Sequence, residues 1–338
     1  MKRKILIFGI GLSFSLAFAT EVTKTGTTAG KFLSIDVGAR SVAMGGAFVA
    51  VANDASTMFW NPAGIASLSN PEVFVSYTKW LADINYNYSG LVLPLKNWGT
   101  LGLNASFLSM EAMEKTTIDE PNGTGEFFDA GSLALGLCYA KSLTDRFAIG
   151  FNGKYIRESI YHSRAQGVAL DIGTLFTTPL YGMKLGMSIS NFGTKMRMTG
   201  DDMLVQHDID PMIAGNNGNI SADLRTDGFD LPLLLRIGVS LDVLKGVPDN
   251  HLILSLDALH PNDNKECLNL GCEYMYRNQL FLRAGYKALF SPDSQQGLTL
   301  GGGIRLRISS SRKIALDYAY QDFGILTNVQ RFSIGFTF

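Results

Sequence analysis

The chain has 338 residues and a formal net charge of −1, a balance that offers no electrostatic attraction for nucleic acid. Apolar residues make up 46% of the chain and charged residues only 17%, which is low against the roughly 25% charged residues of an ordinary soluble domain. Part of the surface is therefore expected to face something other than water.

Residues 1–19 have the pattern of a secretory signal peptide. Basic residues at 2–4 precede an apolar run over 5–18, and Ala17-Phe18-Ala19 forms a small-x-small cleavage site. The run is shorter than the ~20 residues that a membrane-spanning helix needs, which argues against an N-terminal anchor. No cysteine lies directly after the cleavage site, which disfavours a lipoprotein. We expect the mature chain to begin near Thr20.

The next segment, residues 20–72, does not read as a strand. Its stretch from Phe32 to Ser67 is rich in glycine and alanine, and Asn61-Pro62 would stop a helix. It nevertheless carries large apolar side chains that need burial: Phe32, Val42, Met44, Phe48, Val49, Phe59 and Trp60. We predict that this segment is a plug inside a barrel that residues 73–338 build.

From residue 73 onward, apolar and small or polar residues alternate with a period of two. In the last segment, Phe332, Ile334 and Phe336 share one face, and Arg331 and Ser333 share the other. A soluble β-sandwich also alternates and is the alternative fold, but a surface that faces water usually carries more Lys and Glu. A face of small residues suits a crowded lumen, and a face of Leu, Ile, Phe and Tyr suits lipid.

The alternation predicts about fourteen strands, mostly longer than the ~5–6 residues of soluble sheets and suited to a tilted membrane crossing. Their expected positions are 73–82, 84–95, 98–109, 127–141, 145–158, 164–178, 183–192, 229–244, 251–259, 267–277, 279–290, 296–309, 312–322 and 328–338.

Connection lengths give an independent indication of the fold. If the first strand starts on the periplasmic side, odd-numbered connections are extracellular, and the two longest, Ser109–Glu126 and Gly193–Phe229, are both odd. Short periplasmic turns and longer extracellular loops are typical of outer-membrane barrels. The sequence therefore predicts an all-β transmembrane antiparallel barrel in the outer membrane of a diderm bacterium. The same parity predicts that the N-terminus of the plug lies on the periplasmic side.

The sequence resembles the fourteen-stranded FadL-type outer-membrane proteins, and more closely their PorV/PorQ branch. The resemblance rests on Gly38–Ala50, Asn53-Asp54-Ala55 and Trp60–Gly64, since Asn-Pro-Ala-Gly at 61–64 matches the plug motif of the superfamily. It implies transport or export across the outer membrane, either FadL-like passage of hydrophobic molecules or a PorV-like accessory role in type IX protein secretion. The alternative is a structural or partner-binding barrel with no permeant. An open, apolar lumen would favour transport, and a filled lumen with exposed apolar loops would favour partner binding.

The plug motif is the first set of candidate functional residues. Pro62 lacks a backbone donor and glycines permit positive φ, so that the segment can turn repeatedly within a narrow lumen. The motif is interpreted either as a two-state gate or as a static stopper. Its residues are Gly45, Gly46, Asp54, Trp60, Asn61, Pro62, Ala63 and Gly64.

Lumen-facing charges are the second set. We expect them to form ion pairs that tether the plug to the wall, with Arg40 and Asp54 as the plug partners, because an unpaired charge in a confined interior is costly. A polar pathway is the other interpretation. The set comprises Arg40, Asp171, Arg236, Asp242, Asp257, Glu273, Arg283, Arg305, Asp317 and Arg331, with Lys287 beside them.

Other features predict partners rather than chemistry. Phe332, Phe336 and Phe338 resemble the terminal strand that the barrel-insertion machinery reads, and the apolar face predicts contact with outer-membrane lipid. The segment 193–229 combines acidic and apolar residues, which suits a solvated loop or the capture of a hydrophobic ligand or cation, although no EF-hand spacing is present. Hydrophobic small molecules or secretion-system proteins are thus possible partners.

The sequence predicts no enzyme. The four histidines fall in loops or at strand ends, without a G-x-S-x-G or HExxH motif. Three cysteines, Cys138, Cys267 and Cys272, lack metal-ligand spacing, and strand parity puts the last two on opposite faces. We therefore expect no catalytic residue, no metal site, no cofactor and no nucleic-acid partner.

Overall fold

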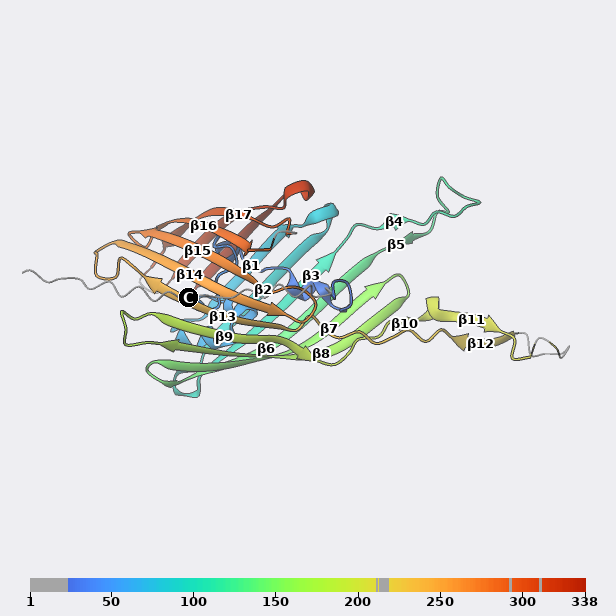
Figure 1. Cartoon of the computed structure of the whole chain (residues 1–338), viewed down its shortest axis with the longest axis horizontal. Helices are drawn as coiled ribbons and strands as arrows, with labels where there is room; N and C mark the ends of the chain where they lie inside the picture. The colour runs from blue at the N-terminus through green and yellow to red at the C-terminus, as the bar shows by residue number, and fades with distance from the viewer. Residues whose placement is uncertain (1–23, 211, 213–218, 292–293, 310–311) are drawn as a thin grey trace, which may run out of the picture.

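The computed structural model describes residues 24–210, 212, 219–291, 294–309 and 312–338 (Figure 1). The predicted signal peptide, residues 1–19, lies outside these residues. No helix among the described residues has the length and apolar character to cross a membrane.

Fourteen long antiparallel strands form one closed barrel, which confirms the predicted fold class. Each strand pairs with its neighbours along the chain, β1 pairs with β19, and a β8–β9 pairing completes the ring. The strands are β1 (Glu72–Lys79), β2 (Asn85–Pro94), β3 (Thr100–Ser109), β6 (Ala130–Thr144), β7 (Phe147–Ile160), β8 (Ser163–Thr177), β9 (Lys184–Gly193), β13 (Leu234–Asp242), β14 (Asn250–Pro261), β15 (Cys267–Tyr276), β16 (Leu280–Leu289), β17 (Leu298–Arg307), β18 (Lys313–Asp322) and β19 (Asn328–Thr337).

The alternating pattern places the two faces of the wall as the sequence predicts. In β19, Phe332 and Ile334 are 52% and 54% exposed on the outside, whereas Arg331 and Ser333 are 1% and 2% exposed in the lumen. An outer band of large apolar side chains and an inner layer of mostly small or polar ones follow from this register.

The two ends of the barrel differ. At one end, here called the long-loop end, the connections 110–129 and 194–233 extend well past the rim (Figure 1). The first holds the hairpin β4 (Met113–Glu114) with β5 (Phe127–Phe128); the second holds β10 (Thr199–Gly200), which extends the pairing of β8, η5 (Asp201–Met203) and the ribbon β11 (Leu204–His207) with β12 (Ile220–Asp223). The opposite rim, here the short-turn end, carries the connections that include η4 (Lys96–Trp98), while η3 (Leu81–Asp83) and η7 (Gly324–Leu326) lie at the long-loop end.

The N-terminal segment fills the lumen as a plug of short helices. These are η1 (Lys31–Ser34), α1 (Ala39–Ala43), α2 (Thr57–Trp60) and η2 (Pro62–Ser67), and most of their residues are buried. The helices are short because glycines with positive φ and Pro62 interrupt them. The segment can therefore fold back on itself within the width of the barrel.

The sequence predicts that the plug begins at the end of the barrel where the first strand starts. This prediction is wrong, because the plug begins at the opposite, long-loop end. Thr28 bridges Asp230, and Lys31 pairs with Asp263 at 2.5 Å, both in connections at the long-loop end. Loop parity fixes only the end at which Glu72 starts the first strand. The plug crosses the barrel between these two points, so its two ends lie at opposite rims.

Candidate functional site

Asn61 is the polar anchor of the plug motif. Its side chain is fully buried, and its Nδ2 donates to the carbonyl of Val49 in the plug at 2.8 Å and to the carbonyl of Thr174 in β8 at 3.0 Å. Its Oδ1 accepts from the N–H of Ala63 at 3.1 Å and caps η2. One amide thus closes the local turn and binds the plug to the wall.

Pro62 lies against the wall because two wall glycines make room for it. A Cβ added to Gly150 would come within 2.4 Å of the Pro62 carbonyl carbon, and one added to Gly173 would come within 2.1 Å of Asn61 Oδ1. Gly64 closes the turn by donating its N–H to the Asn61 carbonyl at 3.0 Å. The motif and the glycines on β7 and β8 therefore fit each other as a backbone-to-backbone contact.

Replacing Asn61 by Ala should lower the free energy of unfolding by about 2–4 kcal/mol, because the Val49 and Thr174 carbonyls lose a buried donor. Thermal or denaturant unfolding in detergent measures the loss. The matched control is Asn70→Ala, at an exposed position near the end of the plug, which should change stability by less than about 0.5 kcal/mol. Equal losses in the two variants would contradict the anchoring role.

Trp60 joins the plug to two neighbouring wall strands. Its Nε1 donates to the carbonyl of Val37 at 3.0 Å, and its own carbonyl accepts from Ser188 Oγ in β9 at 2.9 Å. The guanidinium of Arg236, in β13, lies 5.3 Å from the Trp60 ring and 5.6 Å from the Phe59 ring. Arg236 therefore contributes through cation–π contacts to the plug.

Gly45 and Gly46 bring the plug backbone into contact with the opposite side of the barrel. Their φ angles are +66° and +74°, and a Cβ on Gly45 would lie 2.6 Å from the Leu270 carbonyl oxygen. The N–H of Gly45 donates to Thr299 Oγ1 in β17 at 3.0 Å. Both the turn and the close approach depend on the absence of a side chain.

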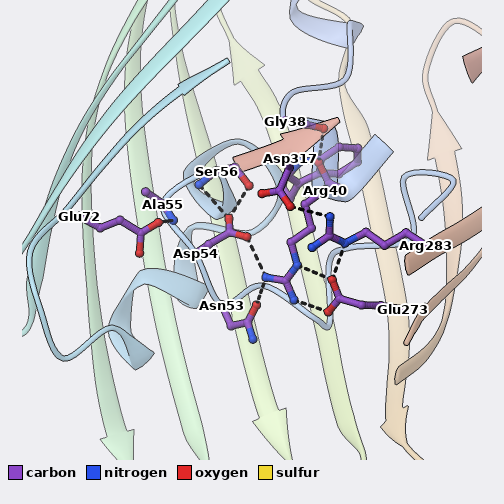
Figure 2. Close-up of polar contacts among 12 residues, drawn as sticks. Gly38, Arg40, Asn53, Asp54, Ala55, Ser56, Glu72, Glu273, Arg283 and Asp317 are labelled. Carbon is purple, nitrogen blue, oxygen red and sulfur yellow. Dashed lines mark hydrogen bonds and ion pairs between the residues drawn. The ribbon is translucent and has the colours of Figure 1, made fainter. Parts of the chain in front are cut away.

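A buried ion-pair network links the plug to three wall strands (Figure 2). Arg40 forms a two-pronged contact with Glu273, with Nε–Oε2 at 2.8 Å and Nη2–Oε1 at 2.7 Å, and its Nη1 lies 2.9 Å from Asp54. Arg283 binds the same Glu273 at 2.6 Å and Asp317 at 2.6 Å. Glu273 and Arg283 have fully buried side chains. Glu273 thus holds one arginine of the plug and one of the wall.

Asp257 makes a second contact between wall and plug. Its Oδ2 accepts from the backbone N–H groups of Phe48 at 2.8 Å and Val49 at 2.9 Å, and the side chain is buried. A carboxylate that receives two backbone donors fixes the position of that turn of the plug.

The other predicted lumen charges bind wall residues or lie beside a ring. Asp171 pairs with Lys154 at 2.7 Å, Asp242 with His251 at 2.7 Å, Arg331 donates to Gln321 at 2.7 Å, and Arg305 lies 4.5 Å from the Phe281 ring. We predicted from the sequence that these four residues tether the plug, but the structure does not place them in contact with Arg40 or Asp54.

Several plug contacts were not predicted. Lys287 is among the predicted lumen charges, but its partner in the plug, Asp36, is not, and neither is Glu72, which accepts from the N–H of Ala55 at 2.9 Å. Wall hydroxyls also bind plug backbone groups, namely those of Ser188, Ser255, Thr299 and Ser333. In the sequence, these hydroxyls are marked only by their position on the lumen face of a predicted strand. Small residues that merely fill space lie on the same face, so this position does not identify a plug contact.

The remaining sequence candidates lie outside the plug. Phe332 stacks obliquely on Tyr318 with ring centroids 5.1 Å apart, and Phe336 meets Phe338 edge to face at 4.7 Å, all on the outer face. In the loop 194–233, Asp202 accepts from Ser163 Oγ at 2.8 Å and so binds the loop to β8. Within the described ranges, no three His, Cys, Asp or Glu side chains gather as a metal site.

Comparison with known proteins gives one family and one fold. The family model described as "Type IX secretion system protein PorV" matches residues 18–202. No curated protein matches the sequence.

Solved structures with the same architecture share little sequence with this chain. The toluene transporter TbuX of Ralstonia pickettii is 12% identical, with 89% of this chain and 97% of that chain covered and a TM-score of 0.53. The CymD monoaromatic hydrocarbon channel is 13% identical, with 89% and 96% covered and a TM-score of 0.56. A FadL homologue of Pseudomonas aeruginosa is 15% identical, with 87% and 96% covered and a TM-score of 0.50. At these identities the likeness shows the fold alone.

Proposed function

Because this chain belongs to the PorV family of type IX secretion system proteins, we propose that it is an outer-membrane accessory of protein export that holds a partner protein at its long-loop end. In this proposal no cargo passes through its own lumen. The long-loop end faces the cell exterior and the short-turn end faces the periplasm, as in other outer-membrane barrels.

The filled lumen is the observation that carries this proposal. Plug side chains such as Met44, Phe48 and Asn61 are 0% exposed, and Trp60 is 1% exposed. Hydrogen bonds or ion pairs join the plug to β1, β7, β8, β9, β13, β14, β15, β16, β17 and β19. Opening a route through the lumen would break many of these contacts together.

The ribbon β11–β12 supplies the surface for a partner. It stands beyond the rim of the barrel (Figure 1) and exposes Leu204 and Ile220 by 53% and 40%, and Leu224, directly after β12, is 56% exposed. Within the described part of the chain, its two strands pair only with each other, so both edges have free backbone groups. Exposed apolar side chains beside free strand edges favour binding of an extended protein segment.

Passage of hydrophobic molecules is the second candidate, and the fold shared with the TbuX transporter and the CymD channel favours it. In this structure such passage requires that the plug leave its wall contacts. The two candidates therefore make opposite predictions about plug movement.

Replacing residues 204–223 by a short Gly-Ser linker should reduce export of type IX cargo to the level of cells that lack the chain. Leu204 and Asp223 are direct partners in the ribbon, so a short linker can join the remaining ends. The barrel should still insert and fold, because the ribbon forms a sheet separate from the barrel. The measurement is the amount of cargo at the cell surface in a complemented deletion strain.

A pair of substituted chains separates apolar contact from loop length. Leu204→Ser with Ile220→Ser and Leu224→Ser should impair export, whereas Gln206→Ser with Asp223→Ser, in the same ribbon, should leave it intact. Normal export without the ribbon would refute the proposal. So would uptake of a hydrophobic dye by liposomes that carry the wild-type barrel, above the uptake of empty liposomes.

A further inference from the structure

A polar cavity of about 600 Å³ opens at the short-turn end of the barrel. The end of the plug forms one side of it, through Asn53, Asp54 and residues 67–70. The first residues of β18, the last residues of β17 and the turn 277–279 form the other side. The cavity ends on the ion-pair network of Arg40 and Glu273, since Asp54 and Asp317 belong to both (Figure 2).

The acidic residues of this cavity already have partners. Asp54 binds Arg40 at 2.9 Å, and Asp317 binds Arg283 at 2.6 Å. Glu72 accepts from the Ala55 N–H at 2.9 Å. Asp54 and Asp317 are thus paired with arginines that do not line the cavity, and among the described residues Glu72 is the one acidic side chain of the lining without a basic partner.

The basic residues of the cavity have no such partners. Four line it, Arg277, Arg305, Arg307 and Lys313, and within the described part of the chain no acidic side chain pairs with any of them. Arg305 is half-buried, and its guanidinium lies 4.5 Å from the Phe281 ring. Among the described residues, its N–H groups have no hydrogen-bond acceptor. The cavity therefore has an excess of unpaired positive charge.

We infer that this cavity binds an acidic peptide segment of a periplasmic protein, with a carboxylate on the guanidinium of Arg305. A guanidinium receives a carboxylate through two parallel N–H donors, and the Phe281 ring below it limits its orientation. Arg307, Lys313 and Arg277 surround the entrance and attract further acidic side chains. The periplasmic origin of the peptide rests on the orientation proposed above, whereas the binding of an acidic peptide does not.

A soluble peptide fits better than a lipid headgroup. The strand pairs β16–β17 and β17–β18 keep continuous register from Leu280 to Tyr286 and from Thr299 to Arg307, so the wall separates the cavity from the bilayer. A phospholipid would have to leave the membrane to place its phosphate on Arg305. A peptide enters directly from the open short-turn end.

Fluorescence anisotropy of a rhodamine-labelled Glu-rich peptide, added to the purified chain in detergent, tests the inference. The wild type should bind the peptide at low salt and lose affinity at high salt, and the same peptide with Gln for Glu should not bind. Arg305→Gln should weaken binding about tenfold or more. Arg305→Lys keeps the positive charge but lacks the two parallel N–H donors of the guanidinium, and it should retain part of the affinity. Partial binding by this variant also shows that a substitution at position 305 leaves the barrel folded.

Arg146→Gln is the matched control, because Arg146 is exposed in the short connection between β6 and β7 and does not line the cavity. It should change the affinity by less than about twofold. Equal weakening by Arg305→Gln and Arg146→Gln would overturn the inference. A second result would also overturn the inference: anionic phospholipid displaces the peptide from the wild type, and the purified chain retains that phospholipid only when Arg305 is present. The cavity would then be a lipid site.

The failure of this inference is distinguishable from the failure of the proposed function. The chain with residues 204–223 replaced should bind the acidic peptide as the wild type does, because the ribbon and the cavity lie at opposite ends of the barrel. Loss of peptide binding in that chain would contradict the inference without bearing on export.

Discussion

Replacing Glu273 by Gln is expected to lower the free energy of unfolding by about 3–5 kcal/mol, as the loss of one partner of a buried ion pair does. The substitution preserves the shape of the side chain but leaves the guanidinium groups of Arg40 and Arg283 without their shared carboxylate. Because Arg40 belongs to the plug, the plug should also become accessible. Denaturant unfolding in detergent measures the stability, and trypsin cleavage after Arg40 measures the accessibility.

Asp242→Asn is the control for this prediction. Asp242 is also a wall carboxylate with a basic partner, His251 at 2.7 Å, but its side chain is 25% exposed and it does not touch the plug. Its loss should cost less than about 1 kcal/mol and leave the plug protected. If the two substitutions have equal effects, Glu273 stabilises only the barrel wall and does not hold the plug.

The second large effect is expected from Gly285→Ala, in β16. An added Cβ would lie 2.1 Å from the N atom of Gly45 and 2.3 Å from the carbonyl carbon of Met44. The backbone of either β16 or the plug therefore has to move. We expect a loss of about 3 kcal/mol, at the upper end of overpacking, together with displacement of this part of the plug. Ion conductance in a planar bilayer should rise above that of the wild type.

Gly153→Ala, in β7, is its matched control, because a Cβ there meets nothing within 4 Å. This substitution should leave both stability and conductance unchanged. If Gly285→Ala instead behaves like Gly153→Ala, the plug is not held tightly against β16, and the description of the lumen as filled is wrong at this point.

The strands could be predicted from the sequence because their signal is repeated many times. Each predicted strand overlaps one of the fourteen strands of the barrel, since Leu, Ile, Phe and Tyr recur at every second position. The ends were less accurate. β1 stops at Lys79 instead of residue 82, because Ala82 and Asp83 take positive φ of 56° and 55°. β13 begins at Leu234 instead of residue 229, because Leu231 is buried beside Gly30 of the plug.

The site could be predicted only in part, for a physical reason. Arg40, Asp54 and Glu273 are charged residues in a predicted lumen, and the cost of an unpaired charge there indicates that they need partners. The choice of partner depends on how the plug folds back within the barrel, which no period in the sequence encodes. For this reason Asp36 was missed, Asp171 was grouped with the plug tethers although it pairs with Lys154, and the N-terminus of the plug was placed at the wrong rim.

Export by a chain whose plug is locked to the wall is the most direct test of the central claim. The N–H of Ala39 donates to Ser333 Oγ at 2.8 Å, so α1 and β19 are in contact here. Ala39→Cys with Ser333→Cys, after replacement of the three native cysteines, is the pair to cross-link by a disulfide, and a non-reducing gel shows whether the bond has formed. With the disulfide formed, export of type IX cargo should equal that of the reduced chain and of the wild type, because the lumen is not the path. Export that stops on oxidation and returns on reduction would contradict the account and make the plug a gate.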